Sequence, residues 1–209
     1  MPTTPNYGLR YPANTDSADI QGHIANLATD LDNQLLYFNN SQQGIYTIKR
    51  DFDATTPLVT VNATTTETTL VTVPISGAQV GDSYKLTIFG TYQNNSAANA
   101  TFTTRAKLGG TTYLTGATAN IATNATRRAL LMTVMVVIES LTVQHIFGST
   151  VLGAASTALS QPIGIGGLGR QWSNQNLATS KDLVVTQAHS NTNANITTAI
   201  HGYTFERVW

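Results

Sequence analysis

Roughly ten short β-prone runs follow one another after residue 44, and this series limits the fold more than any other feature of the chain. The clearest run, residues 83–92, places Tyr84, Leu86 and Ile88 on one face of an extended strand. No helical pattern separates the runs. The sequence therefore predicts a mainly β fold, in which antiparallel strands form a jelly-roll-like β-sandwich.

Turn residues and apolar content place several of the other strands. Residues 100–108 are expected to form a strand that turns through Gly109 and Gly110 into the next one. The run 129–138 is apolar and rich in β-branched residues, which favours a strand buried on both faces. It is shorter than the ~20 residues of a membrane-spanning helix. The stretch 148–179 is rich in Gly, Ser, Ala and Gln, and we expect it to be mostly loop.

An amphipathic pattern occupies residues 16–38, ahead of the β-prone runs. Asp16 or Thr15 can cap a helix, and the apolar residues that follow at spacings of three and four form one narrow stripe. A helix of about 20 residues is only marginally stable alone, so the stripe must pack on the chain's own body or on copies of the helix. The spacing fits a short coiled-coil seam with a polar residue, Gln34, at one core position. The seam residues are Ile20, Ile24, Leu27, Leu31 and Phe38.

The first 14 residues have the composition of an extended peptide. They contain three prolines, which fix φ and disfavour helix in the residue before them. Tyr7, Leu9 and Tyr11 alternate and would point the same way, as in a peptide that docks on another protein. The alternative is a tail that packs loosely on its own domain. The candidate docking residues are Pro5, Tyr7, Gly8, Leu9, Tyr11 and Pro12.

These patterns divide the chain into three parts. Residues 1–14 form the extended docking peptide, residues 15–40 the helix or coiled coil, and residues 45–209 the β-sandwich head. A polar tract that ends in Gly44 separates the helix from the head, because glycine stops a helix and provides a hinge.

The charge balance excludes several classes of partner. Lys and Arg number 11, Asp and Glu number 11, and only 11% of the residues are charged. A chain without a basic stripe is not built to bind a phosphate backbone, so we expect no nucleic-acid partner. No cysteine is present for a disulfide or a thiolate metal site. The first residues lack the basic and apolar regions of a signal peptide, and we expect no membrane insertion.

Motifs for catalysis are weak. Residues 164–169 match G-x-G-x-x-G, but no helical pattern follows them and no acidic residue stands about 20 positions later, as a dinucleotide site requires. Asp51 and Asp53 would share one strand face near the domain boundary, where a solvated edge is the better interpretation than a pair of catalytic acids. The four histidines are scattered without metal-ligand spacing. We therefore expect no enzyme activity, no cofactor and no metal.

Two polar stretches are candidates for ligand contact. Trp172 lies in the stretch 171–176, and an aromatic residue in a polar loop suits contact with a sugar or a protein. The alternative is that Trp172 covers the rim of the sandwich. The other stretch is the polar loop 93–99. The candidate contact residues are Asn94, Asn95, Trp172 and Asn174.

The opening of the chain resembles the N-terminus of many tailed-bacteriophage fibre and minor structural proteins. The matching segments are residues 5–12, 16–20 and 27–32, a proline- and aromatic-rich peptide followed by a short helix. The later part is similar to a phage virion β-domain. The matching parts there are residues 81–90 and 107–112, the pair Arg127-Arg128 and the closing aromatic strand. The resemblance implies a virion protein with a β-sandwich head that forms a homotrimer.

The leading hypothesis is a structural virion protein of a tailed bacteriophage, assembled in the host cytoplasm. It would be a trimeric fibre- or spike-like appendage that docks on capsid, portal or tail proteins through its N-terminus and presents its head for host-surface contact. One alternative is a capsid decoration protein that stabilises the shell. Another is a glycan-binding module, so a host surface glycan is a candidate partner.

Overall fold

The computed structural model describes residues 29, 46–118, 120–153 and 164–208, with the backbone alone at 46–48 and 164–170. The chain divides into two units, Met1–Gly44 and Ile45–Trp209. Thr29 is helical with an exposed side chain. The expected docking peptide and every seam residue lie outside the described residues. No helix of the described part is long and apolar enough to span a membrane.

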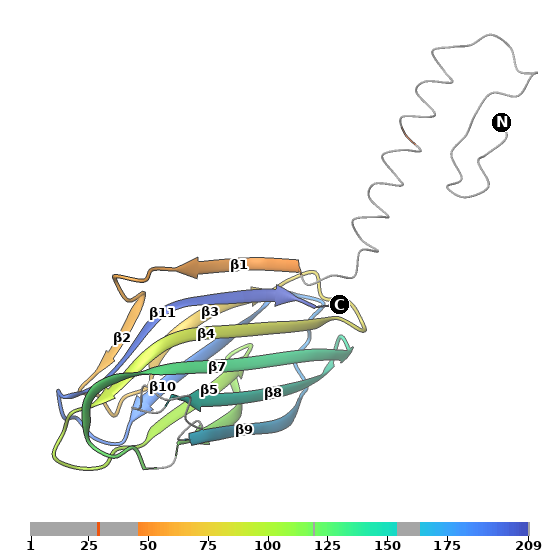
Figure 1. Ribbon diagram of the computed structural model, residues 1–209. Coiled ribbons are helices and arrows are strands. Elements are labelled where there is room, and N and C mark those ends of the chain that lie inside the picture. The colour runs from red at the N-terminus through yellow and green to blue at the C-terminus, as the bar shows by residue number, and fades with distance from the viewer. Residues whose placement is uncertain (1–28, 30–45, 119, 154–163, 209) are drawn as a thin grey trace, which may run out of the picture. The chain divides into compact units, whose positions relative to one another are not determined.

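The described part of the second unit contains eleven strands, labelled in Figure 1. In chain order they are β1 Tyr46–Phe52, β2 Val59–Asn62, β3 Thr68–Ile75, β4 Ser83–Asn94, β5 Phe102–Leu108, β6 Thr111–Ala117, β7 Asn124–Ser140, β8 Val143–Leu152, β9 Gly164–Ser173, β10 Lys181–His189 and β11 Ile196–Arg207.

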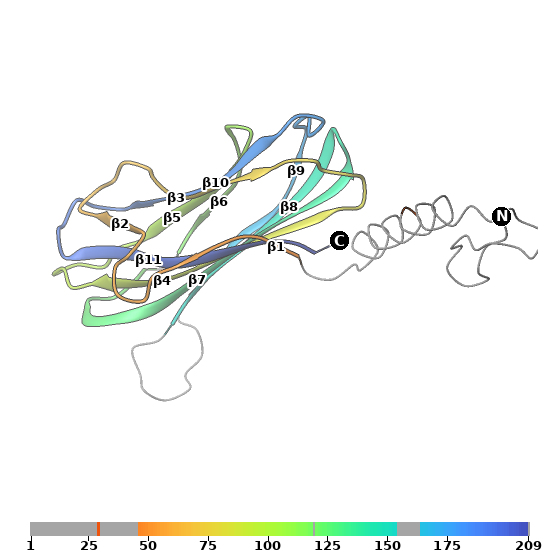
Figure 2. The same cartoon turned by 90° about the horizontal axis from the view of Figure 1, so that it is seen from above.

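The strands form two antiparallel sheets, which appear as two layers in Figure 2. The larger sheet has the order β1-β11-β4-β7-β8-β9, and β2 pairs with β11 alongside β1. The smaller sheet has the order β3-β10-β5-β6. The prediction of a mainly β, antiparallel sandwich is therefore confirmed.

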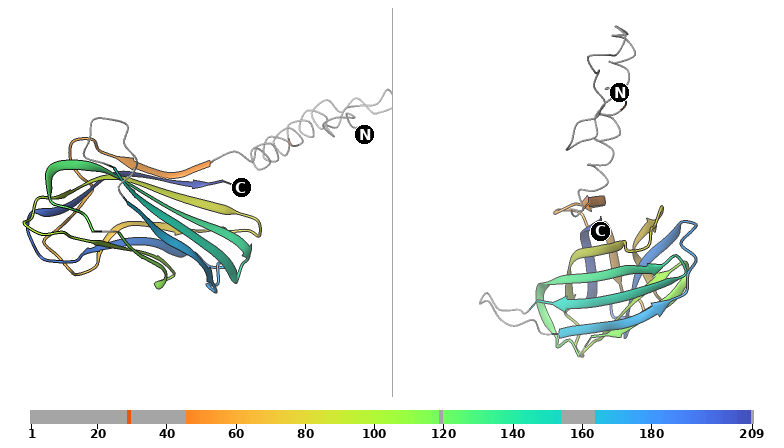
Figure 3. Two further views of the ribbon diagram at one scale, coloured as in Figure 1. Left: turned by 60° about the horizontal axis from the view of Figure 1, so that its bottom comes forward. Right: turned by 90° about the vertical axis from the view of Figure 1, so that its right-hand side faces the viewer.

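The strand order is that of a jelly roll with additions. Strands β2-β11-β4-β7 face strands β3-β10-β5-β6, so the chain passes repeatedly from one four-stranded sheet to the other. Strand β1 and the pair β8–β9 do not belong to this framework of eight strands. Figure 3 shows β7, β8 and β9 side by side, where β8 and β9 widen the larger sheet beyond β7.

The core lies between the two sheets and follows from alternation along the strands. In β4, Tyr84, Leu86 and Ile88 are buried, as their spacing predicts. In β5 the residues that alternate from Phe102 to Leu108 are buried in the same way. Gly109 and Gly110 both have positive φ, 58° and 82°, and form the predicted hairpin turn between β5 and β6.

The prediction that residues 129–138 are buried on both faces is wrong. Along β7 the even-numbered positions from Leu130 to Ile138 are buried, whereas Leu131 is exposed and Met135 and Val137 are half-buried. The smaller sheet covers one face of β7. The other face of β7 belongs to the outer face of the larger sheet, which retains apolar side chains.

For the described residues of the stretch 148–179, the prediction of mostly loop is also wrong. Strand β8 continues to Leu152, and residues 164–173 form β9, which pairs antiparallel with β8. The glycine-rich segment 164–169 is therefore part of a strand and does not connect a strand to a helix, as a dinucleotide site requires.

A buried histidine links the two sheets. His189 of β10 is 3% exposed, its Nε2 lies 3.2 Å from Oγ1 of Thr198 in β11, and its ring packs 4.8 Å from that of Phe102. No described residue hydrogen-bonds its Nδ1. Burial lowers the pKa of His189 from 6.5 to about 4 because the sandwich interior disfavours the charged form.

We predict that His189 makes the head less stable in acid. The unfolded chain binds a proton at this position below about pH 6.5, whereas the folded chain does so only near pH 4. Stability should therefore fall between those values, by about 3 kcal/mol in total. Denaturant unfolding at a series of pH values, with His189→Gln beside the wild type, measures this. The variant should lose most of the slope between pH 6.5 and pH 4, and an unchanged slope would contradict the assignment.

Candidate contact surface

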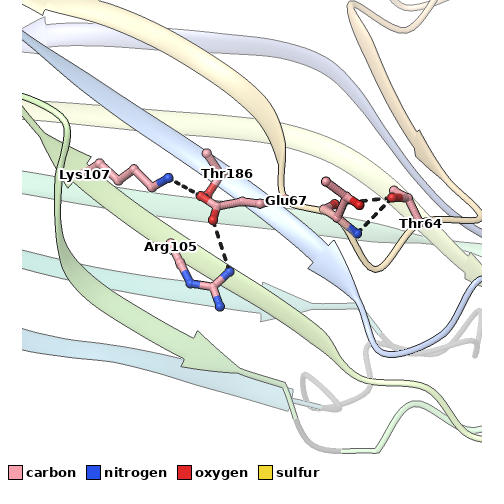
Figure 4. Close-up of polar contacts among 6 residues, drawn as sticks. Thr64, Glu67, Arg105, Lys107 and Thr186 are labelled. Carbon is pink, nitrogen blue, oxygen red and sulfur yellow. Dashed lines mark hydrogen bonds and ion pairs between the residues drawn. The ribbon is translucent and has the colours of Figure 1, made fainter.

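The outer face of the smaller sheet carries a network of charged and polar groups. Glu67, just before β3, contacts Lys107 and Arg105 of β5 and Thr186 of β10 (Figure 4). The Arg105 Nη1 lies 3.5 Å from Glu67 Oε2, and the Thr186 hydroxyl donates to Glu67 Oε1 at 2.5 Å. Lys107 and Thr186 hold the pKa of the Glu67 carboxyl below its usual range. We call these four residues the ion cluster.

The ion cluster fixes local structure. The Thr64 hydroxyl accepts from the Thr66 N–H at 2.9 Å and so folds the turn that delivers Glu67 to β5 and β10 (Figure 4). Each charged group of the cluster has a partner of opposite charge within it. This face therefore suits contact with water better than contact with another protein.

We predict that Glu67→Gln lowers the free energy of unfolding by about 1 kcal/mol, because the two cations lose their carboxylate partner at a partly exposed site. The lowered pKa means that the wild-type contribution is present at neutral pH and is lost as pH falls through the carboxyl range. Denaturant unfolding at pH 7 and pH 3 checks both statements. Asp182→Asn, at an exposed position of β10, is the control. If Glu67→Gln loses no more unfolding free energy at pH 7 than Asp182→Asn does, the stabilising role of Glu67 is contradicted.

The outer face of the larger sheet is apolar by comparison. Seven large apolar side chains are exposed among the described residues, and five of them lie on this face. The strand register places three of them side by side: Phe89 pairs with Leu131, and Gly202 pairs with both Phe52 and Phe89. The five are Phe52, Phe89, Leu131, Phe147 and Trp172.

Three of these residues form a row across β1, β4 and β7. Phe52 of β1 lies over Gly202 of β11. A Cβ atom at position 202 would approach the Phe52 Cδ2 to 2.6 Å, so the close contact requires glycine there. Phe89 and Leu131 continue the row, and each is 38% exposed. We call Phe52, Phe89 and Leu131 the apolar row. An open depression of about 550 Å³ lies beside it. Its lining residues are Arg50, Asp51, Phe52, Phe89, Tyr203 and Thr204.

The other two exposed residues form an aromatic cluster with His145. The rings of His145 in β8 and Trp172 in β9 have centroids 4.0 Å apart and planes at 51°. His145 and Phe147 stack at 6.4 Å with planes at 16°. Trp172 is 57% exposed. The Nε2 of His145 lies 2.7 Å from Oε2 of Glu139, which is exposed at the end of β7.

The hairpin register explains why these side chains meet. Strands β7 and β8 turn at residues 141–142, and this turn pairs Val137 with His145 and Met135 with Phe147. Strand β9 then pairs Trp172 with His145. Directly opposed side chains on one face of a sheet are close enough to interact.

A polar group lies where β9 ends. The Asn174 Oδ1 accepts from the Tyr113 hydroxyl at 2.9 Å, and Gln175 Nε2 donates to the Tyr113 oxygen at 2.9 Å and to Thr111 Oγ1 at 3.3 Å. Burial raises the pKa of the Tyr113 phenol, but hydrogen bonds involving Ser173, Gln175, Asn174 and Thr111 outweigh it, so the pKa is lowered. These contacts hold the end of β9 against β6.

The residues expected to contact a ligand do not form one site. Trp172 and Asn174 are both exposed and stand two positions apart, but Trp172 lies in strand β9 and not in the expected loop. Asn95 is exposed just after the last residue of β4. The first residue of that strand, Ser83, pairs with Val137 near the aromatic cluster, so Asn95 and the cluster lie at opposite ends of β4.

Asn94 is a correction, because its side chain is 2% exposed. Its amide donates to the carbonyls of Ala98 and Ile121 at 3.0 and 2.7 Å, and its Oδ1 accepts from the Ser96 N–H and hydroxyl at 3.2 and 2.6 Å. Asn94 therefore organises the loop after β4 and is not placed to contact a ligand.

Asp51 and Asp53, at the start of the head, lie in different local environments. The Asp53 carboxylate accepts from the Thr55 N–H, the Thr55 hydroxyl and the Thr56 N–H, each at 2.8 Å. These bonds hold the pKa of Asp53 below its usual value. Asp51 is exposed on β1. Across the described ranges, no three His, Asp or Glu side chains are grouped to hold a metal ion.

No family model matches the chain, and no curated protein sequence matches it. Among solved structures, it has a distant similarity to the CBM2 module of the evolved Dit of Lactobacillus casei BL23 phage J-1. The TM-score is 0.32 at 8% identity, over 65% of this chain and 67% of that chain. A structure of infectious bursal disease virus, Gx strain, is similar with a TM-score of 0.27 at 12% identity, over 77% of this chain and 42% of that one. Similarities this distant do not bear on function, and the fold assignment rests on the strand order.

Proposed function

We propose that the chain is a structural virion protein of a tailed bacteriophage. In this proposal it forms a homo-oligomer, a trimer by the resemblance, and a fibre- or spike-like appendage. Residues 1–14 dock on another virion protein, and the β-sandwich head contacts the host surface. The order of docking peptide, helix and head in the sequence supports this arrangement.

One observation carries the proposal for the head: the apolar outer face of the larger sheet. The alternation of β7 leaves Leu131 exposed and Met135 and Val137 half-buried beside Phe89 and Phe147. An exposed patch of large apolar side chains usually marks a site of interaction, because leaving it in water is unfavourable. Among the described residues, the outer face of the smaller sheet, which carries the ion cluster, has no comparable group of large exposed apolar side chains.

The location of the exposed aromatic residues gives further support. Of the exposed aromatic residues in the described part, Phe52 lies on β1, Phe147 on β8 and Trp172 on β9, whereas Phe89 lies on β4. Strands β1, β8 and β9 are additions to the eight-stranded jelly-roll framework. Side chains that project outward from added strands are not needed to fill the core, so contact with a partner accounts for them better than folding does.

We predict that deletion of residues 1–14 leaves the head folded but keeps the protein out of phage particles. The deletion removes Tyr7, Leu9 and Tyr11, the proposed docking face. Circular dichroism checks folding, and immunoblotting of purified particles checks incorporation. Thr3→Ala with Thr4→Ala is the control, because it leaves the docking face intact. Normal incorporation of the truncated protein would contradict the docking role.

Particles that lack the protein separate the main alternatives. Under the proposal they should adsorb poorly to host cells while their shells keep normal thermal stability. Normal adsorption with shells that open at lower temperature would contradict the proposal and support a capsid decoration protein.

A further inference from the structure

We propose that Trp172, His145 and Glu139 form a binding site for a neutral polysaccharide built of pyranose rings with equatorial substituents, of the glucose or N-acetylglucosamine type. The inference rests on the proposed function, since it names the class of host-surface molecule that the head would contact. Three features support the site: the exposure of the Trp172 indole, the His145 ring packed against it and the Glu139 carboxylate beside that ring.

The indole of Trp172 is held in place while much of it stays exposed. Its ring centroid lies 4.0 Å from that of His145, and the side chain is nevertheless 57% exposed. His145 is itself fixed, because Nε2 contacts the Glu139 carboxylate at 2.7 Å and its ring stacks with that of Phe147. A ligand would therefore meet an aromatic surface that has already lost much of its side-chain freedom, which reduces the entropic cost of binding.

A pyranose ring matches this surface in shape and chemistry. When its substituents are equatorial, the ring presents axial C–H groups on both faces, and these pack against an aromatic face. Its hydroxyl groups lie around the rim, where they can donate to an acceptor. The Glu139 carboxylate has about four lone-pair directions, and the contact with His145 involves Oε2. Glu139 thus retains capacity to accept from a sugar hydroxyl.

A second polar group lies just beyond the end of β9. Asn174 is exposed two positions after Trp172, with the buried Ser173 between them. Its Oδ1 accepts from Tyr113, and an amide nitrogen carries two donors. An exposed indole, a carboxylate that contacts the ring packed against it, and an exposed amide two residues further along the chain supply the apolar and directional groups that a sugar requires.

The same features disfavour a protein partner at this position. The centre of a protein–protein interface is depleted of charged residues, whereas Glu139 contacts the ring that packs on Trp172. The apolar row lacks such groups, because Phe52, Phe89 and Leu131 carry no polar side-chain atom. The aromatic cluster is therefore assigned to sugar, independently of what covers the apolar row.

The position on an open sheet indicates a polymer. Trp172 lies on β9, the edge strand of the larger sheet, and projects from its outer face. An extended chain can lie across such a surface with several rings in contact. One ring stacked on one indole binds weakly, and repeated contacts by one polymer on an oligomer raise the avidity.

Tryptophan fluorescence of the full-length chain tests the site. The chain has two tryptophans, so Trp209→Phe leaves Trp172 as the only indole. Titration of this variant with cellopentaose and with chitopentaose should change its fluorescence for at least one of them, whereas polygalacturonate, an anionic polymer, should not. Binding of polygalacturonate alone would overturn the neutral-sugar assignment, as would no response to any of the three.

Calorimetry or affinity electrophoresis with variants then locates the binding. Trp172→Ala should weaken binding at least about tenfold, Trp172→Phe should retain part of it, and Glu139→Gln should weaken it less than Trp172→Ala. Leu131→Ala, in the apolar row, is the matched control and should bind like the wild type. Thermal unfolding confirms that each variant is folded. Undiminished binding by Trp172→Ala would overturn the site.

Adsorption of phage particles separates failure of this inference from failure of the proposed function. If purified protein binds none of the sugars but particles with Trp172→Ala still adsorb poorly, the sugar assignment is wrong and host contact stands. If particles without the protein adsorb normally, the proposed function is wrong, whatever the purified protein binds.

Discussion

The alternation of side chains along β7 is the constraint on which the rest of the structure depends. Successive residues of a strand point to opposite faces, and a two-layer sandwich buries only the inner face of each sheet. Leu130, Met132 and Val134 therefore enter the core, and Leu131, Met135 and Val137, at the alternate positions, face outward. Strand β7 carries apolar side chains on both of its faces, but only one face of its sheet is covered. The uncovered side chains form an apolar surface that favours contact with a partner. The core and the candidate contact surface thus have the same origin.

The added strands extend this surface and give it chemical variety. Strand β1 contributes Phe52 over Gly202, and β8 and β9 contribute the aromatic cluster. The ion cluster makes part of the outer face of the smaller sheet polar, and its charged groups pair with one another. The two outer faces differ in the way expected of a head that meets water on one side and a partner on the other. This division is our account of how the fold serves the proposed function.

Features set by local sequence were predictable. Tyr84, Leu86 and Ile88 share the inner face because alternation is a local property, and Gly109 and Gly110 form a hairpin turn because both adopt positive φ. Strand β9 was missed because its glycine-rich sequence shows no alternation of apolar and polar residues. Its strand conformation depends on pairing with β8, which the local sequence does not reveal. Trp172 was identifiable as an aromatic residue in a polar stretch of the sequence. His145, Phe147 and Glu139 were not, because a register set by the turn after β7 brings them together. Asn94 was misassigned because the backbone carbonyls that occupy its amide come from two separate segments.

The most direct test of the central claim is hydroxyl-radical footprinting of the full-length protein, free and bound to host-cell envelopes. The claim is that the outer face of the larger sheet makes the contact. We expect protection of Met135, Phe147 and Trp172, which lie on that face, and unchanged oxidation of Tyr113 in the smaller sheet. Protection of Tyr113 with no change at Met135, Phe147 and Trp172 would contradict the account.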